Sequence, residues 1–293
     1  TSLGLGATQA AAGISYLFGA PESDITMILL IVGITVIAIG SIIAGVDKGV
    51  QLLSKINIIL AAMLLFFVIA VGPTLMIATG FFENLWNYAV HLPALSNPFG
   101  REDANFSQGW TAFYWAWWIS WSPYVGMFIA RVSRGRTVRE FLVSVMLVPS
   151  TVSVLWMTTF GGTAIDQYVS QGIEAVRDAG VDLQLFMMLE QLPLSQITSF
   201  VAIVLVIVFF VTSSDSGSLV IDSITAGGKV DAPTPQRVFW AIIEGAIAIA
   251  LLLGGGLTAL QTMAVSTGFP FTIILLVACY AIIKGLMSEP KAV

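Results

Sequence analysis

The sequence contains little charge and almost no cysteine or histidine. Charged residues make up 10% of the 293 positions and hydrophobic residues 57%, whereas a soluble domain carries about 25% charged residues. The single cysteine, Cys279, has no partner within the chain, so an intrachain disulfide is excluded. The single histidine, His91, leaves no histidine–acid set of metal ligands, and we interpret it as a solvated or interfacial residue. There is no P-loop pattern and no basic tract, so ATP-driven transport is disfavoured and nucleic acid is not an expected partner.

Long apolar runs take the place of the missing charge. A run of roughly 18 or more apolar residues can cross the hydrocarbon core as a helix. The sequence therefore predicts an all-α polytopic membrane protein, with a single transmembrane domain over residues 1–293. The eight predicted spans are residues 1–19, 25–45, 56–79, 110–130, 141–160, 197–219, 237–255 and 263–284. Thr1 lies inside an apolar run with no signal-peptide pattern before it, so we expect the chain to be a fragment.

Basic residues concentrate on one side of these predicted spans. Ten of the twelve Lys and Arg residues lie there: Lys48, Lys55, Arg131, Arg134, Arg136, Arg139, Lys229, Arg237, Lys284 and Lys291. Only Arg101 and Arg177 lie on the other side, where the loops are acidic. The positive-inside rule makes the basic side cytoplasmic and predicts a multi-pass protein of the plasma (inner) membrane, surrounded by lipid. The first long outer connection, residues 80–108, begins with an amphipathic stretch that we expect to lie along the outer interface.

The fourth predicted span carries an unusual density of tryptophan. Five of the eight tryptophans fall within twelve residues: Trp110, Trp115, Trp117, Trp118 and Trp121. An interfacial belt of aromatic residues accounts for Trp110, but the last three lie two to three turns into the span. Tyr114 shares a helical face with Trp118 and Trp121. Stacked indole faces would hold a quaternary ammonium group by cation–π attraction, worth about 2 kcal/mol or more once desolvated; bulky packing between helices is the alternative. Pro123, one turn further on, is expected to kink the helix.

Hydroxyl groups gather at the end of the sixth predicted span, in residues 212–218. Such hydroxyls either bond back to helix carbonyls or supply oxygen ligands for a hard cation. Two carboxylates also fall near or within spans. Asp215 is either a functional intramembrane acid or a solvated group at the cytoplasmic mouth. Glu244, in the middle of the seventh span, is expected to face protein and to be hydrogen-bonded.

Residues 109–140 read GWTAFYWAWWISWSPYVGMFIARVSRGRTVRE. This run resembles the signature of the betaine/choline/carnitine transporter family, and the spans on either side fall where that family's spans do. The resemblance implies a partial inverted-repeat fold, with the last three helices of a first five-helix repeat and all of a second. It also implies a secondary transporter that imports a quaternary-ammonium compatible solute, such as glycine betaine or choline, for osmoprotection. No enzyme activity is expected.

The same resemblance implies particular functional residues. Trp117, Trp118 and Trp121 match substrate-contacting tryptophans, and we include Tyr114 with them as a substrate-binding candidate. Thr212 and Ser213 resemble a sodium-ligating pair, and Phe209 matches a residue that gives its backbone carbonyl. No cofactor is expected besides Na⁺ as the coupling ion.

The resemblance also bears on the mode of transport and on assembly. Val125 stands where sodium-independent exchangers carry a methionine, so sodium coupling is favoured over the alternative of a carnitine-type antiporter. A channel is a weaker alternative, because no span carries a polar stripe along its full length. The segment after Gly80 matches an outer-surface helix that family members use to form trimers, which implies a homotrimer.

Overall fold

The computed structural model describes residues 1–44, 49–133, 135–229 and 233–288. Within these ranges the chain is helical and contains no strand, which confirms the all-α prediction. The helices are α1 (Ser2–Phe18), α2 (Asp24–Ala44), α3 (Gln51–Val71), α4 (Thr74–Ser96), η2 (Asn105–Thr111), α5 (Ala112–Val132), α6 (Val138–Trp156), η3 (Met157–Gly161), α7 (Gly162–Val169), α8 (Ala175–Asp178), α9 (Gln184–Glu190), α10 (Ser195–Thr225) and α11 (Thr234–Ser288). Lys48, Arg134 and Lys291, which the predicted orientation uses, lie outside the described residues.

Five helical segments in the described part of the chain are long and apolar enough to cross a membrane. They are α2, α3, the continuous segment from α6 to α7, α10 and α11. The segment α11 has 55 residues, more than twice the roughly 20 that one span needs. The helix α1 has 17 residues, and α5 has 21 but contains many tryptophan and serine residues. The eight-span topology and the inverted repeats stay predictions.

The segment predicted as one span over residues 56–79 is not a continuous helix. The helix α3 ends at Val71 and α4 begins at Thr74, with Gly72 extended at φ −81° and ψ −165°. Proline disfavours helical geometry at the residue before it and has no N–H to continue the ladder, which explains a break at Pro73. The Thr74 hydroxyl donates to the carbonyl oxygen of Ile69 at 2.6 Å and so satisfies one acceptor that the break leaves open. The amphipathic outer helix therefore starts earlier than predicted and runs to Ser96.

Two adjoining clusters form the core. In the first, α1, α2, α10 and α11 meet around Leu3, Ile34, Val211 and Leu252. The helix α1 is rich in glycine and alanine, and a Cβ at Gly6 would overlap the ring of Phe210 on α10. Small residues at such positions let helix backbones approach closely, which supports helix association where lipid supplies no hydrophobic driving force.

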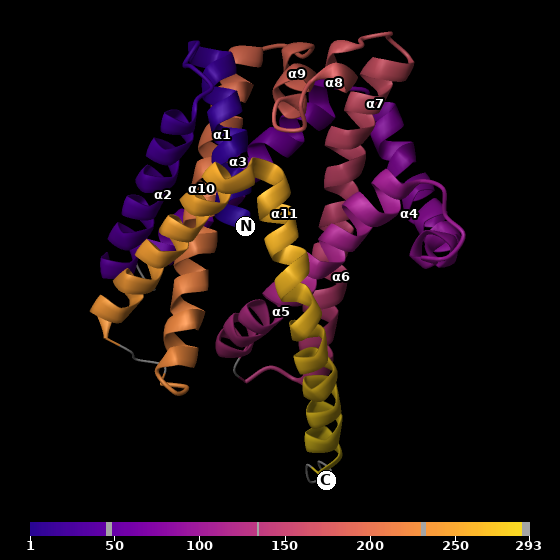
Figure 1. Ribbon diagram of the computed structural model, residues 1–293. Helices are drawn as coiled ribbons and strands as arrows, with labels where there is room; N and C mark the ends of the chain where they lie inside the picture. The colour runs from indigo at the N-terminus through magenta and orange to yellow at the C-terminus, as the bar shows by residue number, and fades with distance from the viewer. Residues whose placement is uncertain (45–48, 134, 230–232, 289–293) are drawn as a thin grey trace.

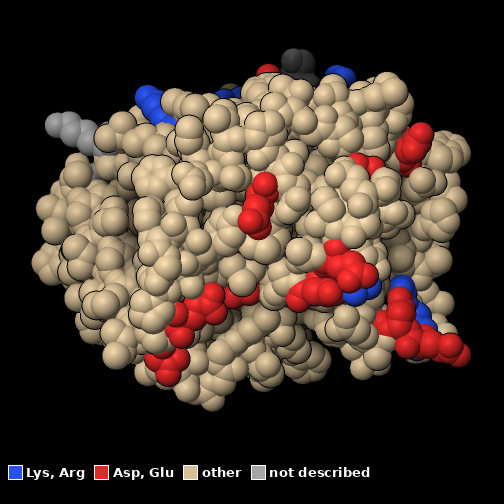
Figure 2. All heavy atoms as spheres, turned by 90° about the horizontal axis from the view of Figure 1, so that it is seen from above, with Lys and Arg blue, Asp and Glu red and all other residues tan. Residues whose placement is uncertain are grey.

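The second cluster joins α3, η3, α8, α9 and α10 around the fully buried Phe186. It lies beneath the end of the molecule that carries α7, α8 and α9, at the top of Figure 1. Figure 2 views the molecule from that end and shows acidic side chains spread over the face, with few basic ones. The helix α4 lies at the edge of the structure in Figure 1 and exposes large apolar side chains, with Phe82 and Trp86 each about 70% exposed.

The long segment α11 is broken in its middle. Gly256 has φ 57° and ψ −139°, a conformation that a residue with a side chain adopts only with strain. The break falls between the two spans predicted at 237–255 and 263–284. Before it, Ala248 and Leu252 pack in the core with α2 and α10. Beyond it, Gly268 lies so close to α5 that an added Cβ would come 2.8 Å from the carbonyl oxygen of Ala116.

Candidate functional site

One face of α5 forms a row of aromatic rings. Phe113 stacks on Trp117 with ring centroids 5.4 Å apart, and Trp121 meets Tyr124 edge-on at 5.9 Å. Positions 113, 117, 121 and 124 share one side of a helix, so the spacing alone brings these rings together. The helix continues through Pro123, and the Ser122 hydroxyl donates to the carbonyl oxygen of Ile119 at 2.8 Å. This carbonyl is the acceptor that loses its usual partner at Pro123, so the helix stays satisfied without breaking.

A cavity of about 290 Å³ opens beside this row. Its walls come from the start of α1, from α5, from α10 and from both halves of α11. Trp117, Trp121 and Tyr124 supply the aromatic side, and Ser213 and Glu244 supply polar groups. Two of its walls, α10 and α11, are long and apolar enough to cross a membrane, and a concave space between helices is a common place for a small-molecule site.

A single hydroxyl orients both tryptophans of the cavity. The indole N–H of Trp117 donates to Ser2 Oγ at 3.1 Å, and that of Trp121 donates to the same atom at 3.0 Å. The polar edge of each ring is thereby satisfied by protein, and the remaining ring surface is left to line the cavity. No local pattern predicts this contact, because Ser2 lies more than a hundred positions away from its partners.

The other two predicted substrate residues do not line this cavity. Trp118 is 73% exposed and Tyr114 is 46% exposed, and together with Trp115 and Ile119 they border a separate, shallow hollow. Successive residues in a helix differ by about 100° in direction, so Trp117 and Trp118 face different surroundings. The structure thus brings together Trp117 and Trp121 at the cavity. Tyr114 contacts Trp117 with ring centroids 6.0 Å apart but does not line the cavity, and Trp118 faces away from it. A substrate role for either pair stays a prediction.

Of the predicted sodium ligands, Ser213 lines the cavity, whereas Thr212 and Phe209 do not. The Thr212 hydroxyl donates to the carbonyl oxygen of Phe209 at 2.8 Å, so these two oxygens are neighbours. Ser213 lines the cavity itself. No cluster of three or more histidine, cysteine or acidic residues suited to a metal occurs in the described ranges. Hydroxyl and carbonyl oxygens are the ligands that this region offers, and hard cations prefer oxygen.

Both intramembrane carboxylates contact hydroxyl groups. Asp215 is buried, and its Oδ2 accepts a hydrogen bond from Ser41 on α2. Glu244 accepts from the Ser214 hydroxyl at 3.0 Å, so the expectation that it faces protein and is hydrogen-bonded is met. Asp215 is therefore tied to α2 within the bundle, whereas Glu244 borders the cavity.

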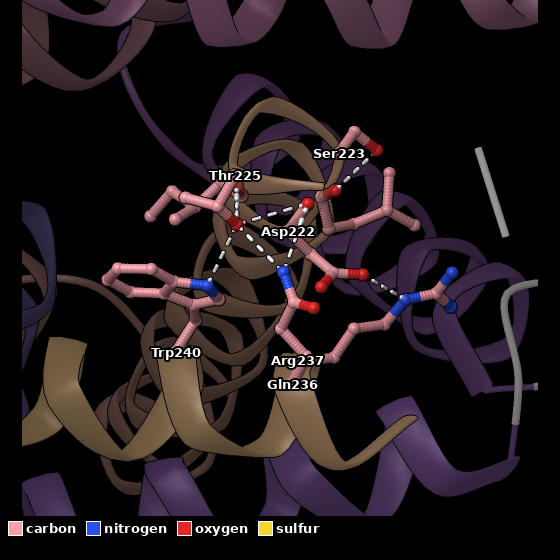
Figure 3. A network of polar contacts seen from close by, with 8 residues as sticks. Asp222, Ser223, Thr225, Gln236, Arg237 and Trp240 are labelled. Carbon is pink, nitrogen blue, oxygen red and sulfur yellow. Dashed lines mark hydrogen bonds and ion pairs between the residues drawn. The ribbon is translucent and has the colours of Figure 1, made fainter. Parts of the chain in front are cut away.

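A polar network ties the end of α10 to the start of α11 (Figure 3). Asp222 Oδ2 lies 2.9 Å from the Nε of Arg237, and the two side chains are only 1% and 15% exposed. Beside this pair, Thr225 accepts hydrogen bonds from Gln236 at 2.9 Å and from the Trp240 indole N–H at 3.1 Å. From the sequence, Arg237 was interpreted only as a signal of membrane orientation. Asp222 and Arg237 lie on either side of the short connection between α10 and α11. An acid and a base in these positions were the sequence signal that could have predicted the ion pair.

Comparison with known proteins identifies the family of this chain. Residues 1–291 match the betaine/carnitine/choline family transporter model. The chain belongs to this transporter family. It is 68% identical over 291 residues to a glycine betaine/proline/choline transporter of Vibrio parahaemolyticus, covering 99% of this chain and 53% of that protein. It is 40% identical over 296 residues to the glycine betaine transporter OpuD of Bacillus subtilis, covering 100% of this chain and 58% of that protein.

Membership in the betaine/carnitine/choline transporter family confirms an integral membrane protein and places the chain in a family of transporters, not of enzymes. The family resemblance of residues 109–140 is confirmed as well. The chain spans about half the length of the curated relatives it matches.

Proposed function

We propose that the protein carrying this chain is a secondary transporter for a quaternary-ammonium solute such as glycine betaine or choline. The observation that carries the proposal is the cavity whose aromatic wall, Trp117 and Trp121, is held in place by Ser2. A trimethylammonium group carries charge but no N–H, so hydrogen-bond acceptors cannot bind it directly. The negative faces of desolvated aromatic rings can, and tryptophan is the best of them. The names of the relatives support the same substrate class.

Replacing a cavity tryptophan tests this proposal. Trp121→Ala removes the indole that borders the cavity, and the apparent affinity for labelled glycine betaine or choline should weaken about tenfold or more, as expected for a cation–π contact worth some 1.4 kcal/mol or more. Phe99→Ala, which removes an exposed ring that does not line the cavity, is the matched control and should leave affinity unchanged. Unchanged binding and uptake in the Trp121 variant would refute the proposal.

The exposed pair on α5 is the second candidate position for substrate. Trp118→Ala tests it in the same assay, because Trp118 lines only the shallow hollow with Tyr114. Loss of affinity in the Trp118 variant alone would move the binding position from the cavity to that hollow. Loss in both variants would mean that substrate contacts both sides of α5.

Sodium coupling is part of the proposal. The hydroxyls of Thr212 and Ser213 and the carbonyl of Phe209 are the proposed ligands, and a cation there would adjoin the substrate cavity. Removing both hydroxyls (Thr212→Ala with Ser213→Ala) should move half-maximal uptake to much higher sodium concentration, while substrate binding at saturating sodium changes less. The exposed Thr79 hydroxyl on α4 bonds back to its own helix, so Thr79→Ala serves as the control. Full activity with potassium in place of sodium on both sides of the membrane would favour a sodium-independent exchanger instead.

We also propose a homotrimer in which α4 takes part. This helix exposes Phe82, Trp86 and Tyr88 at the edge of the structure. An interface between copies would bury these side chains, although contact with lipid would satisfy them too. Mass measurement in detergent and in lipid nanodiscs tests the proposal, and a monomer under every condition would refute it.

Osmoprotection is the proposed physiological role of the transporter. The accumulation of solute at high external osmolarity tests this role.

A further inference from the structure

The cavity contains one carboxylate that neither the aromatic wall nor the proposed sodium ligands account for. Glu244 borders the cavity from α11, and Trp117 and Trp121 border it from α5. Its Oε2 accepts a hydrogen bond from Ser214 on α10 at 3.0 Å, which fixes the carboxyl group against that helix. The other acid of this region, Asp215, is bonded to Ser41 and does not line the cavity.

A glycine leaves the space between this carboxylate and the aromatic wall open. A Cβ at Gly217 would lie 3.3 Å from Glu244 Oε1 and 3.7 Å from Cη2 of Trp121. The second carboxylate oxygen and the edge of the indole therefore flank the same gap, and the absence of a side chain at Gly217 keeps it free. One carboxylate oxygen, Oε2, is held by Ser214. The other, Oε1, lies at the gap beside the cavity.

A carboxylate beside an aromatic wall suits a cation that has no hydrogen to donate. The ring faces attract the ammonium group locally, whereas the carboxylate acts through its charge over a longer distance. Such an interaction is stronger away from bulk water, where the effective dielectric constant is lower and salt screens less. A net cation gains the full attraction. A zwitterion gains less, because its own carboxylate is repelled by the same charge.

We infer that Glu244 is the counter-charge for the ammonium group in this cavity and sets the preference for a net cation over a zwitterion. The inference rests on the proposed function and adds a determinant of specificity to it. Ser214 acts as the positioning residue for the carboxylate, and Gly217 keeps the gap open.

The test is to measure binding and uptake of choline, a net cation, and of glycine betaine, a zwitterion, by the transporter that contains this chain. In Glu244→Gln, choline affinity should fall about tenfold or more and glycine betaine affinity less than about threefold, equivalent to a relative change of roughly 1 kcal/mol. Glu244→Asp keeps the charge but withdraws it by one methylene, so the preference should shift in the same direction by a smaller factor. Gly217→Ala places a methyl group in the gap and should weaken both substrates.

Asp215→Asn is the matched control, since it removes one negative charge from the same bundle outside the cavity, and it should leave the choline-to-betaine ratio unchanged. An unchanged ratio in both Glu244 variants, or an equal loss for both substrates, would overturn the inference while leaving the aromatic site intact. If Glu244→Gln does not reach the membrane, the ratio in Glu244→Asp decides. A wild-type protein that binds neither substrate would instead refute the proposed function itself.

Discussion

The buried ion pair between Asp222 and Arg237 should stabilise the junction of α10 and α11 measurably. Asp222 is 1% exposed and Arg237 15% exposed, with 2.9 Å between Oδ2 and Nε. At an effective dielectric constant of 20, charges about 3 Å apart attract by about 5 kcal/mol, and the cost of desolvating both ions offsets part of this. Removing one partner of such a pair typically costs about 3–5 kcal/mol, because the other charge stays buried alone. Since Arg237 keeps some contact with solvent, we expect Asp222→Asn to cost about 3 kcal/mol.

Thermal unfolding of the purified protein at one scan rate is the measurement. A loss of about 3 kcal/mol should lower Tm by roughly 6 °C in a chain of this size. Arg237→Gln should also destabilise, and the double variant should lose less than the sum of the two single losses, as expected for residues in direct contact. Asp178→Asn is the control, because its pair with Arg177 is half exposed and such pairs contribute little. Additive losses, or a Tm of the Asp222 variant within about 1 °C of wild type, would contradict the reasoning.

Two further predictions concern packing and pH. Gly6→Ala would push a methyl group into the Phe210 ring and should destabilise by about 1–3 kcal/mol, whereas Gly33→Ala enters open space and should be neutral or slightly stabilising in thermal unfolding. In the connection between α4 and η2, the hydrogen bond from Arg101 holds the pKa of Asp103 below its ordinary value of 3.8. The pair therefore stabilises the loop fully above that pH and loses its contribution as pH falls through the lowered pKa. An NMR titration of the Asp103 carboxyl that gives a pKa at or above 3.8 would contradict this.

The sequence predicted the helical class correctly, and its spacing predicted that several aromatic rings share one face of α5, because both depend on local patterns. Apolar run length decides whether a helix can span, and a spacing of three or four residues puts rings on one face. The same spacing left open which face matters, since Trp121 lies at helical spacing from both Trp117 and Trp118. That choice depends on what packs against α5. Gly268 brings α11 to within contact of Ala116, and Ser2 comes from the other end of the chain.

The helix breaks show a different limit. Pro73 carried a signal for a break, but the continuous apolar run on both sides of it suggested a longer span than the structure has. Contacts between distant segments had no local signal at all. The hydrogen bond of Asp215 to Ser41 spans 174 positions, and only the packing of α2 on α10 creates it. Polar groups within spans could thus be predicted to need partners, but the partners could not be named.

The arrangement of α10 explains how one helix can border the cavity and still be held firmly. Asp215 ties it to α2, and Ser214 and Asp222 tie it to the first half of α11. The second half of α11 instead packs on α5, through Gly268 and through Phe271, whose ring lies 6.4 Å from that of Tyr124. The glycine break at residues 255–256 separates these two halves, and the cavity lies between α10 and α5. The break therefore lies between the half of α11 that is bonded to α10 and the half that packs on α5, and both halves contribute walls to the cavity.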